Sequence, residues 1–434
     1  MSPTASVPLR VLALLSLVLL QAAVALAQPA RKPNVIFILS DDMGYADIGS
    51  YGAKDIRTPH LDRLARDGVR LTDAYSNGPV CTPTRAAFVT GRYQQRVSKA
   101  MEWAVLPEQR DDTLPLTETT IARMLKDDGY ATALFGKWHL GYPLENGPLA
   151  HGFDEYFGII GGNADMYSHE NINGENVLYE GSARTKSPGY LTEQLSNRAA
   201  EFIQRQKDRP FFLYLAYNAV HWPFQASGST VRSRQTWYDG TRQEYARMLE
   251  AMDQGIGTVL AKLDQLGLAK DTLVIFTNDN GGERLSSNEP FFHHKATLWE
   301  GGIRVPGILR WPGHLPASNV SAQVAITMDF SATILAATST KPARALDGIN
   351  LLPILSGRAP QQERTLFWRI VTRPDRQMKA VRQGNWKYVR DGEIDMLFDL
   401  KADPGERHDL SYQQPSRVRS MQRALDEWER QFPR

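Results

Sequence analysis

The only cysteine of this 434-residue chain is Cys81, which opens the run Cys-Thr-Pro-Thr-Arg at positions 81–85. A lone thiol has no disulfide partner within its own chain, so crosslinking does not explain it. Pro83 favours the first turn of a helix, and the helical pattern after it ends at Gly91. Backbone N–H groups at a helix start favour an anion, and Arg85 adds a planar donor suited to tetrahedral oxyanions. The run therefore predicts a reactive residue beside an anion site, although a buried structural cysteine with a surface arginine has the same short pattern.

Side chains with oxygen ligands form a second set. Asp41 and Asp42 are adjacent, and Asp279 is followed by Asn280. Carboxylate and amide oxygens suit Ca²⁺ or Mg²⁺, and a divalent cation would offset the repulsion between three carboxylates placed together. Zinc is disfavoured because no tightly spaced set of histidines and cysteines accompanies them. A single Asp-Asp pair more often caps a turn or a helix; two such clusters, each directly after a predicted strand, indicate a metal site.

Basic and imidazole side chains form a third set. Lys137, His139, His221 and Lys295, together with Arg85, are of the types that bind an anion and move protons around a transferring group. Each one alone is typical of a solvated surface residue or of a structural histidine. A joint function requires a shared location, which depends on the elements that carry these residues.

Four short apolar runs, rich in β-branched or aromatic residues, are predicted to be buried strands of a largely parallel sheet. They cover residues 35–39, 131–135, 211–217 and 272–277. Helical patterns lie between them, at residues 121–129, 191–206 and 244–266. Alternating strands and helices predict an α/β fold. Each strand leads into polar residues of the sets above, and ligands of open α/β sheets bind beyond the carboxyl ends of the strands, so we expect one composite site there.

Composition limits the classes of function. The 50 basic and 48 acidic side chains leave a formal charge of +2. This balance gives no electrostatic footprint for a polyanion, so we expect no nucleic-acid partner. A hydrophobic content of 42% allows the chain to bury one large domain or two unequal ones.

The N-terminus has the pattern of an export signal. Arg10 precedes an apolar stretch that ends in Ala-Leu-Ala at residues 25–27. This order predicts a signal peptide over residues 1–27 and hence a periplasmic or secreted protein, with no membrane span once the signal is cleaved. An uncleaved anchor is the alternative, because the apolar run approaches the length of a spanning helix.

Ordered motifs along the chain resemble those of the type I sulfatases. They are the runs at residues 34–45 (NVIFILSDDMGY), 58–64 (TPHLDRL), 81–85 and 90–92 (CTPTR, TGR), 136–141 (GKWHLG), 278–282 (NDNGG), 295–306 (KATLWEGGIRVP) and 397–406 (LFDLKADPGE). The resemblance covers nearly the whole mature chain, and such an ordered set is highly specific. Thr84 departs from the pattern, since many members have serine there. Serine and threonine both carry a small hydroxyl side chain, so we expect the enzyme that modifies this motif in the family to accept threonine at position 84.

Members of this family share an alkaline-phosphatase-like α/β fold, with a large mixed sheet between helices and a smaller C-terminal subdomain that carries a short antiparallel sheet. The resemblance therefore implies a catalytic domain over residues 28–345 and a C-terminal α+β subdomain over residues 346–434. It also implies a sulfatase of the arylsulfatase or carbohydrate sulfatase kind. Such an enzyme hydrolyses a sulfate monoester to an alcohol and inorganic sulfate.

The implied catalyst is made from Cys81. A separate maturation enzyme oxidises the motif cysteine of these proteins to an aldehyde residue, formylglycine, whose hydrate attacks sulfur to give a sulfo-enzyme intermediate. The second hydroxyl of the hydrate then expels sulfate, so water does not have to attack a hindered sulfur. Carried over to this sequence, Ca²⁺, or else Mg²⁺, would be held by Asp41, Asp42, Asp279, Asn280 and the oxygen derived from Cys81.

The resemblance also assigns roles to the cationic set. His139 would assist the elimination of sulfate, and His221 with Lys295 would protonate or stabilise the leaving oxygen. Lys137 and Arg85 would hold the hydrate and the sulfate oxygens.

The substrate implied is a sulfated small molecule or glycan. Its specificity is expected in the loops at residues 161–180 and 227–238, whose polar and aromatic content suits a sugar ring. Two other functions stay open. A phosphodiesterase or phosphonate monoester hydrolase of the same superfamily would make the same demands on metal and oxyanion binding. A non-catalytic exported binder of sulfated glycans is the alternative from another class, against which the complete catalytic set speaks.

Overall fold

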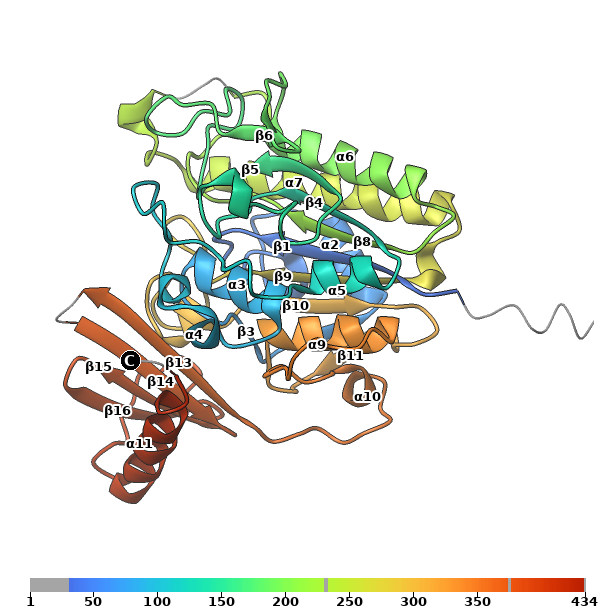
Figure 1. Cartoon of the computed structure of the whole chain (residues 1–434). Coiled ribbons are helices and arrows are strands. Elements are labelled where there is room, and N and C mark those ends of the chain that lie inside the picture. Colours follow the sequence, from blue (N-terminus) through green and yellow to red (C-terminus); the bar gives the residue numbers. More distant parts are fainter. Residues whose placement is uncertain (1–30, 230–232, 374–375, 433–434) are drawn as a thin grey trace, which may run out of the picture.

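The structure is a computed structural model that describes residues 31–229, 233–373 and 376–432, so the predicted signal peptide at residues 1–27 lies outside the described residues. A large mixed sheet forms the centre of the molecule, with helices on both faces (Figure 1). A smaller antiparallel sheet lies at the C-terminal end of the chain. This architecture confirms the predicted fold class.

The elements have the following bounds. The large sheet contains β1 (Asn34–Ser40), β2 (Val69–Leu71), β4 (Ala131–Gly136), β5 (Glu155–Ile159), β6 (Leu178–Glu180), β7 (Ala183–Arg184), β8 (Phe211–Ala216), β9 (Thr272–Asn278), β10 (Gly307–Arg310) and β11 (Asn319–Ser321). A two-stranded sheet contains β3 (Ala74–Tyr75) and β12 (Ala325–Ile326), and the C-terminal sheet contains β13 (Thr365–Arg373), β14 (Arg376–Gln383), β15 (Trp386–Asp391) and β16 (Ile394–Asp399). The helices are α2 (Pro59–Arg66), α3 (Cys81–Thr90), α4 (Gln94–Val97), α5 (Ile121–Asp127), α6 (Leu191–Arg205), α7 (Arg242–Gln265), α8 (Glu300–Ile303), α9 (Thr327–Thr338), α10 (Leu352–Leu355) and α11 (Pro415–Glu429).

The four predicted strands are β1, β4, β8 and β9, at the centre of the sheet order β11-β2-β10-β9-β1-β8-β4-β5-β6-β7. Neighbours from β9 to β5 are parallel, and the antiparallel strands β10, β6 and β7 on the two flanks make the sheet mixed. Every residue of the four central strands is buried. Strands covered on both faces read as continuous apolar runs, which explains why the sequence predicted them.

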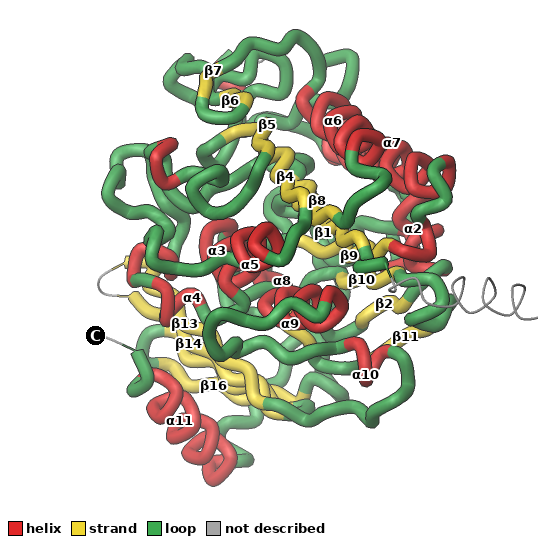
Figure 2. The backbone as a smooth tube through the Cα atoms, turned by 45° about the vertical axis from the view of Figure 1, so that its right-hand side comes forward, coloured by secondary structure: helices red, strands yellow, loops and turns green. Residues whose placement is uncertain are grey.

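Each face of the large sheet packs against its own set of helices (Figure 2). From β1, Ile36 and Ile38 enter the core that contains α2, α6 and α7. Val35, Phe37 and Leu39 point to the opposite face and enter the core that contains α3, α5, α9 and α10. The predicted helices at residues 121–129, 191–206 and 244–266 are α5, α6 and α7. Among the described residues, none of these helices combines the length and the apolar character that crossing a membrane requires.

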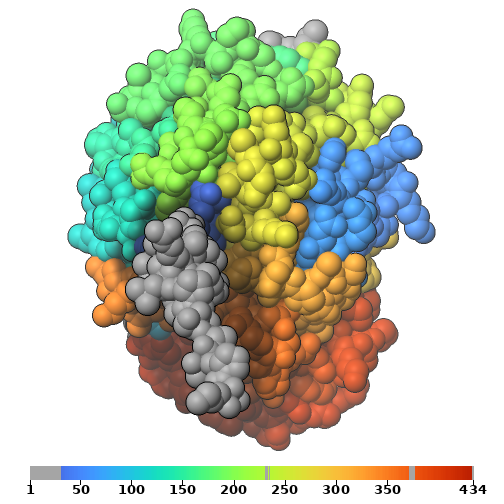
Figure 3. All heavy atoms as spheres, turned by 90° about the vertical axis from the view of Figure 1, so that its right-hand side faces the viewer, coloured from blue at the N-terminus to red at the C-terminus, as the bar shows by residue number. Residues whose placement is uncertain are grey.

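The C-terminal sheet, which begins at Thr365, packs with α11 in a third core. In the space-filling view the C-terminal residues, in red, lie directly against the rest of the chain (Figure 3). The helix α10 joins the core of the large sheet. The division of the chain at residue 346 stays a prediction.

Buried ion pairs connect the C-terminal sheet to α8, in the part of the chain that contains the large sheet. Lys387 of β15 lies 2.9 Å from a carboxylate oxygen of Glu300 and 2.9 Å from one of Glu406. Glu300, the first residue of α8, also accepts a hydrogen bond from Tyr75 at 2.6 Å and pairs with Arg304 at 3.0 Å. All five side chains are buried. Removing one partner of such a buried ion pair leaves the other charge uncompensated, which destabilises the fold.

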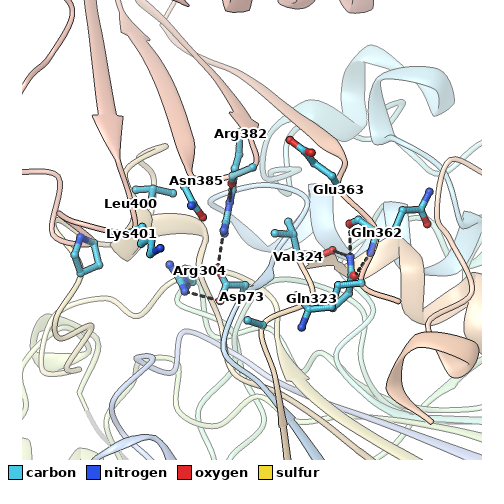
Figure 4. A pocket seen from close by; sticks show the side chains of 14 residues that line it. Asp73, Arg304, Gln323, Val324, Gln362, Glu363, Arg382, Asn385, Leu400 and Lys401 are labelled. Atoms are coloured by element: carbon cyan, nitrogen blue, oxygen red, sulfur yellow. Dashed lines mark hydrogen bonds and ion pairs between the residues drawn. The ribbon is translucent and has the colours of Figure 1, made fainter. Parts of the chain in front are cut away.

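Beside these ion pairs is a polar cavity of about 450 Å³. Asp73, between β2 and β3, and Arg304, directly after α8, line it on one side, and Arg382, Asn385 and Lys401 line it from β14 and the connections next to β15 and β16 (Figure 4). Asp73 pairs with Arg382 at 2.6 Å and with Arg304 at 3.0 Å, so these charges are neutralised across the contact. The cavity therefore lies at the contact between the C-terminal sheet and the rest of the chain, next to the ion pairs that connect them.

We expect Lys387→Met to lower the free energy of unfolding by about 3–5 kcal/mol, because it leaves the Glu406 carboxylate buried without its cation and removes one of the two cations that pair with Glu300. Denaturant titration followed by circular dichroism measures this change. The matched control is Arg423→Met, at an exposed position of α11 that does not line this cavity, for which we expect a change within about 0.5 kcal/mol. Equal stability of the two variants would contradict the account of this contact.

Candidate active site

The predicted site residues meet at the carboxyl ends of the central strands. After β1 come Asp41 and Asp42, after β4 Lys137 and His139, after β8 His221, and after β9 Asp279 and Asn280. The start of α3 supplies Cys81 and Arg85, and the loop before α8 supplies Lys295. Nine of these ten are linked by direct polar contacts, and His139 is linked through Thr82. The composite site that the sequence predicted is thus present in the fold.

Cys81 is the first residue of α3, and the helix ends at Gly91 with a left-handed φ of 67°, as the sequence predicted. Its Sγ lies 3.2 Å from Lys137 Nζ and 3.5 Å from Asp41 Oδ1. Burial, with the negative charge of Asp41 added, raises the pKa of the Cys81 thiol well above its ordinary value. A thiol in this environment stays protonated and is a poor nucleophile.

Asp41 is held by cations on one side. Its Oδ2 lies 2.6 Å from Lys137 Nζ and 3.8 Å from Arg85 Nη2. Burial and the negative charge of Asp279 nevertheless raise the pKa of Asp41 to about 7. The protein alone therefore leaves the charged carboxylate short of compensation, which a divalent cation would supply.

Asp42 is the centre of the other half of the cluster. Its Oδ2 lies 2.6 Å from Lys295 Nζ and 3.5 Å from His221 Nε2, and its Oδ1 accepts a hydrogen bond from Asn280 at 2.8 Å. Burial alone would raise the pKa of Asp42, but the positive charges of Lys295 and Lys137 outweigh it and lower the pKa below its usual range. Asp42 is therefore an anion that can serve as a ligand.

Arg85 is fully buried, and each of its three side-chain nitrogens donates a hydrogen bond. Nε and Nη2 donate to Asp279 Oδ2 at 3.1 and 2.7 Å, and Nη1 donates to the Lys137 carbonyl oxygen at 3.0 Å. This fork orients Asp279 toward the cluster. Arg85 thus supports a predicted metal ligand as well as contributing positive charge beside Cys81.

The donor set fits a hard divalent cation. Ligand atoms of Asp41, Asp42, Cys81 and His221 all lie within 4.8 Å of one another. Asn280 uses Nδ2 as a donor, and its buried Oδ1 has no hydrogen-bond partner within the described part of the chain. The two ends of an amide have similar size, so turning it over presents the oxygen to a cation. An oxygen in place of the Cys81 sulfur would make the set richer in the ligands that Ca²⁺ and Mg²⁺ prefer.

Both histidines of the cluster are neutral, since burial lowers the pKa of His139 and of His221 well below the ordinary value. His139 Nε2 lies 3.0 Å from the Val105 carbonyl oxygen, an acceptor, so this nitrogen carries the proton. In the residues that the structure describes, the buried Nδ1 of His139 has no hydrogen-bond partner, and it is left with a lone pair that can accept a proton. His221 Nδ1 likewise donates to the Trp222 carbonyl oxygen at 2.7 Å.

Sequence reasoning missed several residues that position the site. Asn278 accepts hydrogen bonds from Ser40 at 2.7 Å and from the Met43 backbone at 3.2 Å, which ties the loop after β9 to the loop after β1. Thr82 donates to the His139 carbonyl oxygen at 2.9 Å. Asn278 and Thr82 lie inside the motifs at residues 278–282 and 81–85. Their place in these motifs was the only sequence feature that could have predicted a position close to the site. Glu283, 3.7 Å from Lys295 Nζ, had no such signal.

The two loops predicted to set specificity border the cluster. Gly162 packs against the His139 ring so closely that a Cβ would lie 3.0 Å from Cε1. At the other side, the Tyr238 ring lies 4.4 Å from that of Trp222, which is next to His221. These contacts bring parts of both loops to the site.

Comparison with known proteins identifies the family. The sulfatase family model matches residues 33–340, and the model of the N-sulphoglucosamine sulphohydrolase C-terminal region matches residues 288–431. The chain belongs to the sulfatase family. The resemblance stated from the motifs is confirmed, and the protein is a sulfuric ester hydrolase with an alkaline-phosphatase-like fold.

This sulfatase is similar to proteins that act on different esters. Steryl-sulfatase of Mus musculus is 34% identical over 532 residues, covering 94% of this chain and 83% of the relative. N-acetylgalactosamine-6-sulfatase of Homo sapiens is 34% identical over 441 residues, covering 88% and 82%. Among solved structures, Ps i-CgsB in complex with k-i-k-neocarrahexaose has a TM-score of 0.84 and 31% identity, covering 92% of this chain and 93% of that chain. The two relatives that are similar in sequence are thus a steryl sulfatase and a carbohydrate sulfatase.

Proposed function

We propose that this sulfatase is exported and hydrolyses sulfate monoesters of carbohydrate or aryl alcohols through the hydrate of a formylglycine made from Cys81. The position of Cys81 carries this proposal. Its buried sulfur lies at a helix start, between Lys137 Nζ and Asp41, within the cluster of hard ligands. A protonated thiol has no evident role there, whereas a diol oxygen at the same place would lie among a cation's ligands.

Ca²⁺, or Mg²⁺ in its place, would be held by Asp41, Asp42, Asp279, Asn280 and the oxygen on Cys81. When bound, such a cation lowers the pKa of a coordinated hydroxyl and neutralises charge on the sulfate. Three carboxylates in the cluster already face the cations of Arg85, Lys137 and Lys295. The added divalent charge therefore leaves the site positive overall, as binding of an anionic ester requires.

The protein residues divide the chemistry between two sides of the site. On the inner side, Lys137 and Arg85 would hold oxygens of the hydrate and the sulfate, and His139 Nδ1 would take the proton of the second hydroxyl as sulfate leaves. On the outer side, Lys295, and His221 once it carries a proton on Nε2, would protonate or stabilise the oxygen of the departing alcohol. His221 and Lys295 both contact Asp42 Oδ2, which places the two side chains next to each other at this side of the site.

The proposed modification requires a partner. A maturation enzyme of the same host would oxidise Cys81, and the Thr84 variant of the motif would still be accepted. The predicted signal peptide supports export to the periplasm or the medium. Protein made without a matching maturation enzyme would fold and show little activity.

Parallel assays test the proposed reaction. We expect mature protein to release inorganic sulfate from 4-nitrophenyl sulfate and from sulfated sugars with a higher kcat/KM than it releases phosphate from 4-nitrophenyl phosphate or a phosphonate monoester. The shared demands of tetrahedral esters make phosphate the relevant competitor. Faster turnover of the phosphorus esters would instead favour a phosphodiesterase or phosphonate monoester hydrolase. Tight binding of sulfated glycans without turnover would favour a non-catalytic binder.

A further inference from the structure

The site becomes more exposed toward Lys295. Asp41, Arg85 and Lys137 are fully buried, whereas the side chains of Lys295 and Glu283 are 14% and 35% exposed. The ester must enter with its sulfate toward Cys81, so the alcohol that leaves has to lie on the exposed side. Residues around Lys295 are therefore the ones that contact the alcohol part of the substrate.

Glu283 supplies a hydrogen-bond acceptor at this place. Its Oε2 is buried, lies 3.7 Å from Lys295 Nζ and has no hydrogen-bond partner among the described residues. The Trp222 and Asp42 side chains lie next to the same carboxyl group. A buried carboxylate oxygen without a donor costs free energy, so it indicates a donor that arrives with the ligand.

Aromatic rings adjoin Glu283. The Trp222 ring lies 4.6 Å from the His221 ring and 4.4 Å from the Tyr238 ring. Tyr238 is 53% exposed, while Trp237, 6.2 Å from Trp222, is 2% exposed and anchors the segment. Exposed aromatic surface next to a catalytic cluster is available for a ligand, because aromatic faces bury apolar area at little cost in side-chain entropy.

We propose that Trp222, Tyr238 and Glu283 form a subsite for the sugar ring that carries the sulfate. The aromatic rings contact the C–H face of the sugar, and Glu283 accepts a hydrogen bond from a hydroxyl next to the sulfated carbon. This inference rests on the proposed sulfatase function and narrows its substrate to carbohydrates. A sterol or simple aryl sulfate offers apolar surface to the rings and no hydroxyl donor beside the ester.

The charge of Glu283 narrows the substrate further. A second sulfate or a carboxylate on the neighbouring carbon would face the Glu283 carboxylate and lose the hydrogen bond. The subsite therefore favours a sugar whose neighbouring position is a free hydroxyl.

The test uses mature full-length protein and a panel of monosulfated glucose, galactose and N-acetylgalactosamine, with 4-nitrophenyl sulfate as the aryl probe. For the sugar that the wild type hydrolyses best, we expect Glu283→Leu to lower kcat/KM at least about tenfold, as loss of a hydrogen bond to a charged group does. Turnover of 4-nitrophenyl sulfate should fall by a smaller factor than turnover of the sugar, because that ester has no hydroxyl for Glu283 to bind and loses only the contact of Glu283 with Lys295. Glu283→Gln, which keeps an acceptor oxygen, should recover part of the loss.

A substrate lacking the neighbouring hydroxyl completes the comparison. We expect Glu283→Leu to lower kcat/KM for this deoxy sugar sulfate by the same factor as for 4-nitrophenyl sulfate, since the hydrogen bond to the neighbouring hydroxyl is already absent. Tyr238→Ala should raise KM for the sugar about tenfold. The matched control, Tyr412→Ala, removes a tyrosine that is 94% exposed in the C-terminal subdomain. It should leave kcat and KM unchanged for both the sugar and the aryl ester.

Equal losses on the sugar and aryl esters in Glu283→Leu would overturn the subsite, because they would indicate a disturbed Lys295 instead. Unchanged sugar kinetics in both Glu283→Leu and Tyr238→Ala would overturn it as well. Failure of the proposed function looks different, since the wild type would then hydrolyse none of the sulfate esters.

Discussion

Replacing Cys81 by alanine should lower kcat/KM for 4-nitrophenyl sulfate by at least about 1,000-fold, the scale on which removal of a covalent nucleophile acts. Cys81 is buried in the first turn of α3, and alanine is smaller and suits a helix, so the fold should persist. Steady-state kinetics and thermal unfolding measured together separate loss of catalysis from loss of structure. Thr84→Ser is the matched control and should hydrolyse the ester at the wild-type rate.

A serine at position 81 sharpens this prediction. Cys81→Ser retains one hydroxyl but lacks the second one that would expel sulfate, so any sulfate that it accepts should remain attached. We expect no sustained turnover from this variant, and mass analysis of the peptide after incubation with substrate would detect bound sulfate. Full hydrolysis by either variant would show that Cys81 is not the source of the nucleophile.

Removal of the divalent cation should have the second largest effect. Dialysis against a chelator should lower kcat/KM by at least about 100-fold, and Ca²⁺ should restore it, because the cation activates the hydroxyl and balances the sulfate. Chelation should also lower the Tm, since burial and like charge already raise the pKa of Asp41 to about 7 without the ion. At a free concentration about 100 times the Kd, the ion should stabilise the fold by about 2.7 kcal/mol.

Asp41→Asn separates binding from catalysis in this experiment. The variant loses a ligand charge, so its Tm should respond less to added Ca²⁺ than that of the chelated wild type. Titration with Mg²⁺ under the same conditions compares the two ions. Unchanged activity and an unchanged Tm after chelation would contradict the metal site.

The central sheet and the start of α3 were predictable because their signals are local. Buried parallel strands such as β1 read as continuous apolar runs, and Pro83 with Gly91 delimits a helix. The rule that ligands bind beyond the carboxyl ends of parallel strands then brought Asp41, Lys137 and Asp279 together. Local pattern and general topology were enough for most of the cluster.

The remaining contacts depend on chain segments that meet only in the folded protein. Lys387 and Glu300 form a buried pair across 87 positions of sequence, and neither has a local pattern that names its partner. The rings of Trp222 and Tyr238 meet at a tilted angle only because of the path of the loop between them, and Glu283 lies near Lys295 because of the turn that joins them. Lys295 itself was placed by its motif, since a lysine in a loop carries no signal of its own.

The most direct test of this account is peptide mass analysis of the segment that contains Cys81, with aldehyde-specific labelling, on protein purified from its native host. We predict a peptide in which the CH₂–SH group has become an aldehyde and which reacts with a hydrazide or aminooxy probe. The same peptide from Cys81→Ala should not react. An unmodified, unlabelled thiol in protein that hydrolyses sulfate esters at full rate would contradict the formylglycine mechanism.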